Sequence, residues 1–130
     1  MLTIQQVRDL AMSLPETTER DHHGMDSFRV GGKIFATIPD DDHVRAMVDE
    51  SAILAAVDEN PVACEAFYWG KRLACVVVAL RAAPPALVKE LLIDAWLRKA
   101  PKSLASDFSQ LDDQNDLATK SPRAAKRTGQ

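Results

Sequence analysis

The clearest pattern in the chain is a pair of short runs with β-type alternation, residues 27–30 and 33–38, separated by Gly31 and Gly32. A two-residue type I′ turn needs positive φ at both central positions, which glycine adopts freely. The sequence therefore predicts a β-hairpin here. The register that follows by counting pairs Val30 with Lys33, Arg29 with Ile34, and Phe28 with Phe35.

Both faces of this hairpin carry apolar side chains. The alternation places Phe28, Val30 and Phe35 on one face, and Met25, Ile34, Ala36 and Ile38 on the other. Helices can cover only one of these faces. The other face is therefore expected to be covered by a partner, a second copy, the tail or a ligand.

The remaining pattern predicts helices where apolar residues recur at three- and four-residue spacing and strands where they alternate or run together. Residues 16–26 are polar and glycine-broken, which indicates a loop. The expected helices cover residues 3–14, 52–59 and 84–100, and the further strands cover residues 43–48, 66–69 and 73–80. The order α-β-β-β-α-β-β-α predicts an α+β two-layer sandwich, an antiparallel sheet with helices on one face.

Length and composition agree with one globular domain. The 130 residues are 46% hydrophobic and 27% charged, and we expect a domain over residues 1–105 followed by a polar, disordered tail over residues 106–130. No apolar run approaches the roughly 20 residues of a membrane span, and the first residues do not resemble a signal peptide. We therefore expect a cytoplasmic protein without membrane contact, in which Cys64 and Cys75 are buried thiols.

The net charge of −3 hides an uneven distribution. Residues 1–68 contain five basic and thirteen acidic residues, whereas residues 69–102 contain seven basic and two acidic ones. A chain divided in this way can present a basic face in spite of its acidic balance.

Four segments, taken in order, resemble the MmcQ/YjbR-like family. They are V-R-D-L-A-M-S-L-P-E-T at 7–17, H-x-G-x-x-S-F-R-V-G-G-K-I-F-A at 22–36, W-G-K at 69–71 and A-W-L-R-K-A-P-K at 95–102. The resemblance covers roughly residues 1–108. It implies a frataxin-like (CyaY-like) α+β fold in a double-wing arrangement and a DNA-binding function. It implies no set of catalytic residues.

The candidate nucleic-acid contacts are basic residues at the predicted hairpins and beyond the last helix, with an aromatic side chain for stacking. They are Arg29, Lys33, Arg45, Trp69, Lys71, Arg72 and Lys102. Arg98 and Lys99 could extend the same surface. The alternative interpretation is that the turn residues are solubilising charges, that Trp69 packs in the core, and that the charges ending the last helix complement its dipole.

Two other kinds of chemistry are weaker in the sequence. Histidines and aspartates near residues 21–26 and 40–43 have the atoms of a metal site but no recognised ligand spacing. The chain also lacks a P-loop, a G-x-G-x-x-G run and a G-x-S-x-G run, so we expect neither an enzyme nor a cofactor.

The sequence thus predicts a small DNA-binding domain whose affinity is low and independent of base sequence. The alternative is a protein- or small-ligand-binding module that uses the uncovered face of the sheet, with a protein partner or a homodimer as its complex. The two differ in what covers that face.

Overall fold

The computed structural model describes the backbone of residues 1–115 and the side-chain surroundings of residues 1–108. The chain divides into two compact units, residues 1–100 and a second unit that begins at Pro101. The first unit holds the elements α1 (Ile4–Met12), β1 (Thr18–His22), β2 (Met25–Val30), β3 (Lys33–Asp40), β4 (His43–Ala46), α2 (Glu50–Glu59), β5 (Cys64–Trp69), β6 (Arg72–Ala79) and α3 (Pro85–Lys99). The second unit holds α4 (Lys102–Asn115).

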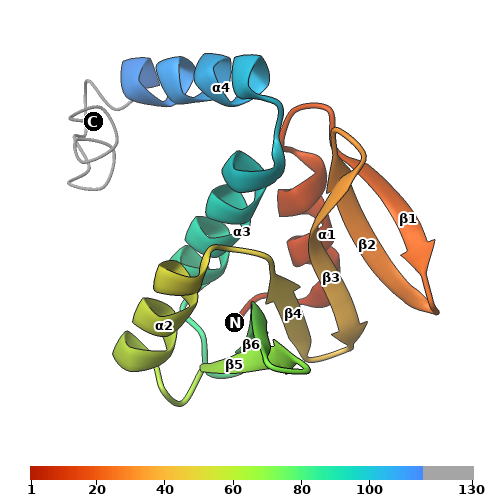
Figure 1. The fold of residues 1–130 in the computed structure, drawn as a ribbon, viewed down its shortest axis with the longest axis vertical. Helices are drawn as coiled ribbons and strands as arrows, with labels where there is room; N and C mark the ends of the chain where they lie inside the picture. The colour runs from red at the N-terminus through yellow and green to blue at the C-terminus, as the bar shows by residue number, and fades with distance from the viewer. Residues whose placement is uncertain (116–130) are drawn as a thin grey trace. The chain divides into compact units, whose positions relative to one another are not determined.

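The strands form one antiparallel sheet in the order β1-β2-β3-β4-β6-β5. Helix α3 packs against β3 and β4, α2 packs against β5 and β6, and α1 packs against α3 (Figure 1). This is the α+β antiparallel architecture that the sequence predicted. None of the helices in the described part of the chain combines the length and the apolar character of a membrane span.

The Gly31–Gly32 hairpin is confirmed, with one correction. Gly31 and Gly32 both have positive φ, 59° and 78°, and the pairs Val30–Lys33 and Arg29–Ile34 are formed. Beyond Arg29 the register shifts by one residue, so Phe28 lies opposite Ala36 instead of Phe35. A β-bulge inserts one extra residue into one strand. The bulge moves Ala36 and Ile38 toward the core and leaves Thr37 on the opposite face.

Strand β1 was missed from the sequence. Residues 16–26 were expected to be a loop, but Thr18–His22 pairs with β2 as the outer strand of the sheet. Edge strands often carry charged side chains, which removes the apolar alternation that would reveal them. The β1–β2 turn also uses His23 at a φ of 52°, a conformation that few residues other than glycine adopt.

Helix α1 is held to this edge by Arg8. Its Nε donates to Glu19 Oε2 at 2.9 Å, and its Nη2 pairs with Asp26. The two carboxylates raise the pKa of Arg8, chiefly through the hydrogen bond with Glu19. Asp26, a candidate metal ligand in the sequence, is therefore engaged in an ion pair.

The core lies between the sheet and the helices. Its large fully buried side chains include Phe28, Phe35, Ile53, Leu92 and Trp96. The rings of Phe28 and Phe35 lie 6.5 Å apart despite the shifted register. Trp96 in α3 donates its indole N–H to the Pro15 carbonyl at 3.0 Å, which joins the last helix of this unit to the end of the first.

The second unit corrects the expected tail. Disorder was predicted from residue 106, but α4 continues to Asn115. Leu104, Phe108 and Leu111 recur at four- and three-residue spacing, which is the periodicity of an amphipathic helix. The expectation for residues 116–130 lies outside the described residues.

Candidate functional site

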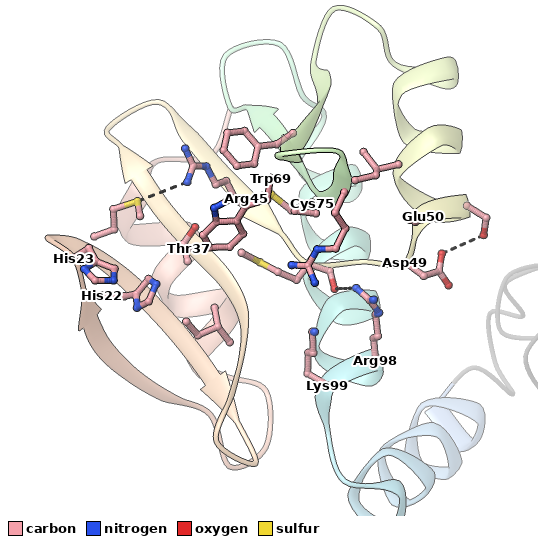
Figure 2. Close-up of a pocket in the computed structure, with 18 residues that line it drawn as sticks. His22, His23, Thr37, Arg45, Asp49, Glu50, Trp69, Cys75, Arg98 and Lys99 are labelled. Atoms are coloured by element: carbon pink, nitrogen blue, oxygen red, sulfur yellow. Dashed lines mark hydrogen bonds between the residues drawn. The ribbon is translucent and has the colours of Figure 1, made fainter.

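The candidate site lies where the central strand β4 stops. β4 pairs with β3 only as far as Ala36 and with β6 only as far as Val76. Residues 33–35 of β3 and 72–75 of β6 therefore extend past Ala46 without a strand between them. This opening is part of a pocket of about 890 Å³ (Figure 2).

The end of helix α3 closes one side of this pocket. Arg98 Nη1 donates to the carbonyls of Met47 and Val48 at 3.1 and 2.8 Å. These bonds fix the last turn of α3 beside the connection between β4 and α2. Figure 2 shows Arg98 and Lys99 extending from α3 toward the pocket, whereas Thr37 and Arg45 come from the sheet.

The lining combines apolar and basic groups. The larger apolar side chains are Met25, Ile34, Met47, Phe67, Trp69 and Leu73, and the basic ones are Arg45, Arg72, Arg98 and Lys99. Two carboxylates, Asp49 and Glu50, lie at the start of α2. The Asp49 carboxylate caps this helix, because it accepts a hydrogen bond from the Ala52 N–H at 2.8 Å. The pocket is therefore suited to an anion that also has an apolar or planar part.

Basic residues crowd around Lys99. Partial burial lowers the pKa of Lys99 below its ordinary value, and the charges of Arg98, Lys33 and Arg72 lower it further. We call Lys33, Arg72, Arg98 and Lys99 the basic rim. Like charges held together repel one another, so an anion that binds among them is favoured electrostatically.

Removing two charges of the rim tests this arrangement. In a Lys33→Ala, Arg72→Ala variant we expect the pKa of Lys99 to rise, because two neighbouring positive charges are gone. An NMR titration of the Lys99 Cε resonance measures this change. Between the lowered pKa of Lys99 in the folded state and its higher pKa in the unfolded state, the unfolded chain binds more protons. The free energy of unfolding of the wild-type protein therefore increases with pH in this range. An unchanged pKa in the variant would show that Lys33 and Arg72 do not contribute, which leaves burial and Arg98 as the causes of the shift.

Arg45 lies at the centre of the sheet side of the pocket. Its guanidinium is 4.4 Å from the centre of the Phe67 ring, a cation–π distance. Its Nη1 is 3.9 Å from Met25 Sδ, a weak acceptor, and its Nε is enclosed without a hydrogen-bond partner. Among residues 1–108 no carboxylate lies within ion-pair distance of Arg45. This cation is available to an incoming ligand.

The structure brings together only part of the set predicted from the sequence. Arg45, Trp69 and Arg72 line the pocket, and Lys33 belongs to the basic rim. Arg29 pairs with Ile34 and is partly buried, with its Nε enclosed and unpartnered, but it does not line the pocket. Lys71 is exposed beside the β5–β6 turn, and Lys102 begins α4 in the second unit.

The alternative interpretation of Trp69 as a core residue is wrong. Its side chain is 67% exposed, at the tip of β5 and against the pocket. An exposed indole of this kind is available for stacking.

Thr37 and Phe67 were not found from the sequence. Thr37 is the polar residue of an otherwise apolar run. The face of the sheet on which it lies could not be predicted, because the bulge changes the alternation of side chains along β3. Only the register shows it opposite Arg45. Phe67 resembled a core residue of an apolar strand, and its contact with Arg45 depends on tertiary packing.

The histidines and aspartates do not converge on a metal. His43 Nδ1 and Asp40 Oδ1 are 2.8 Å apart at the β3–β4 turn, and this contact lowers the pKa of Asp40. His22 and His23 line the pocket with their rings 4.5 Å apart. Within the described part of the chain, no three His, Cys, Asp or Glu residues are grouped as metal ligands.

Comparisons with known proteins agree with the fold. The YjbR family model matches residues 12–98. A crystal structure of the Deinococcus radiodurans protein DR2400, described with the domain name DUF419, is similar with a TM-score of 0.66 and 22% identity. The similarity covers 75% of this chain and 78% of that one. A search among curated proteins gave no significant match.

Proposed function

This chain belongs to the YjbR family, and we propose that its first unit binds nucleic acid through the pocket and the basic rim. One observation carries this proposal: although the chain is acidic overall, Arg45, Arg72 and Lys99 lie together with an exposed Trp69 around one pocket. Basic grooves that follow a phosphate backbone, with aromatic side chains on which bases stack, are typical of proteins that bind single-stranded nucleic acid.

We infer a binding function instead of a catalytic one. Cys75 is the cysteine of the pocket, and burial raises the pKa of its thiol, which disfavours the nucleophilic thiolate. Asp49 is used as a helix cap. The basic side chains are placed to bind an anion, and no cofactor is needed for that role.

The proposal predicts binding that weakens steeply with salt. Each phosphate contact releases counterions, so affinity for labelled DNA should fall as ionic strength rises, in proportion to the number of contacts. Arg72→Ala should reduce the slope of log K against log salt by about one. Fluorescence anisotropy at several salt concentrations measures both effects.

Lys89 provides the matched control. It is exposed in α3, the same helix as Lys99, and it does not line the pocket. Lys89→Ala should leave the affinity and the salt slope unchanged. No binding to single or double strands even at low salt would contradict the proposal.

A second candidate function is the binding of a small ligand in the pocket. Its volume of about 890 Å³ lies within the range of about 300–1,000 Å³ that small-molecule sites occupy. The mixture of apolar walls and a few polar groups is also typical of such sites. Binding of a protein partner, or formation of a homodimer, over the face of the sheet that carries the pocket stays a separate prediction.

A further inference from the structure

The floor of the pocket contains two neighbouring polar groups without partners. Thr37 on β3 lies directly opposite Arg45 on β4. The Thr37 side chain is only 3% exposed, and its hydroxyl has no hydrogen-bond partner among the described residues. Arg45 Nε is enclosed and unpartnered in the same way. Buried polar groups are almost always paired, so two adjacent exceptions beside a pocket indicate groups that a ligand can pair with once the side chains around them adjust.

The wall beside this floor is aromatic. The Arg45 guanidinium lies over Phe67, and Trp69, two residues further along β5, is exposed at the pocket mouth. Planar groups stack on such surfaces. A nucleobase is planar, and its exocyclic carbonyl oxygens and ring nitrogens can pair with a guanidinium and a hydroxyl at the same time.

The basic rim supplies the complementary site for an acidic group. Lys99 reaches the pocket from α3, on the other side from Thr37 (Figure 2). Arg72 lines the pocket from the start of β6. A ligand that satisfies both regions therefore has a planar polar part and a negatively charged part. A nucleoside monophosphate has this composition.

We propose that the pocket takes one unstacked nucleotide, with the base toward Thr37, Arg45 and Phe67 and the phosphate on the basic rim. This inference rests on the proposed function and narrows it to single strands. A base inside a duplex is paired along one edge and stacked on both faces, so it cannot reach a buried floor unless it leaves the helix. The same chemistry is available from a strand and from a free mononucleotide.

The first test is a competition experiment with the full chain. We expect a labelled oligothymidylate of about a dozen nucleotides to bind at least about tenfold more tightly than a duplex of equal length at the same salt. Thymidine monophosphate should displace the strand at lower concentration than either thymidine or inorganic phosphate, because only the monophosphate uses both regions. Equal affinity for strand and duplex, or no displacement by the monophosphate, would overturn the proposal.

The second test changes the floor alone. Thr37→Val keeps the shape of the side chain and removes the hydroxyl, so strand affinity should fall about three- to tenfold with the salt slope unchanged. The melting temperature should stay the same or rise, because a buried unpartnered polar group is lost. Thr17 is the matched control: its hydroxyl is also enclosed and unpartnered, but it lies outside the pocket. Thr17→Val should leave strand affinity unchanged.

The outcomes distinguish binding of a nucleotide in the pocket from binding of nucleic acid by the basic rim. Salt-dependent binding of strand and duplex that ignores Thr37→Val would overturn the pocket and preserve nucleic-acid binding by the rim. Binding of the monophosphate without binding of either oligonucleotide would support the pocket as a free-nucleotide site and overturn the nucleic-acid function. Equal losses in Thr37→Val and Thr17→Val would overturn a direct role for Thr37.

Discussion

Replacing Trp96 with alanine is expected to destabilise the first unit by about 3–5 kcal/mol. The side chain is fully buried and its indole N–H donates to the Pro15 carbonyl at 3.0 Å. Alanine would therefore leave a large cavity and an unpaired carbonyl. Domains of this size are stable by only about 5–15 kcal/mol, so the loss should be evident in urea denaturation at neutral pH.

The chain's two tryptophans form a natural pair for this experiment. Trp69 is 67% exposed, and Trp69→Ala should change the free energy of unfolding by less than about 0.5 kcal/mol. Trp96→Phe keeps most of the packing but loses the hydrogen bond, so its effect should lie between the two. Similar losses for Trp69→Ala and Trp96→Ala would contradict the assignment of one indole to the core and the other to the site.

The second large effect concerns charge at the pocket. Reversing two charges of the basic rim, Arg72→Glu with Lys99→Glu, should reduce affinity for single-stranded DNA at least about 100-fold, which corresponds to about 2.7 kcal/mol. The variant both removes phosphate contacts and introduces repulsion with the strand. Anisotropy titration at low salt measures the loss.

A control with the same net charge isolates the position of these residues. Arg81 after β6 and Lys89 in α3 are exposed and do not line the pocket, so Arg81→Glu with Lys89→Glu gives an equally acidic chain. This control should bind with near wild-type affinity, since exposed charges far from the strand are screened by salt. Equal losses in both double variants would mean that net charge, and not the pocket, governs binding.

The distinction between net and local charge explains how an acidic protein can offer a site for an anion. Three carboxylates of the first unit are engaged within the protein: Glu19 and Asp26 pair with Arg8, and Asp49 caps α2. Arg45 has no such partner among the described residues. The local charge available to a ligand therefore depends on which charged side chains are already paired within the protein.

Local chemistry made several elements predictable. The two glycines specified the turn and its adjacent pairs, because few other residues adopt positive φ at both positions. Apolar periodicity gave the three helices of the first unit and most strands. The charged edge strand β1 and the helix after Pro101 were missed, since β1 lacks an apolar face and the weak period of α4 lies in a polar segment.

The sequence by itself therefore determined the hairpin, the α+β class and the identity of most basic candidates, because turn geometry and burial patterns are local properties. Only the tertiary structure decided which of these residues meet. The bulge after Phe28 turned Thr37 to the face of Arg45, and the early end of β4 opened the space that α3 closes with Arg98 and Lys99. The hydrogen bond from Arg98 to the Val48 carbonyl joins residues 50 positions apart, and such contacts depend on how the strands end and pack. No local pattern encodes that arrangement.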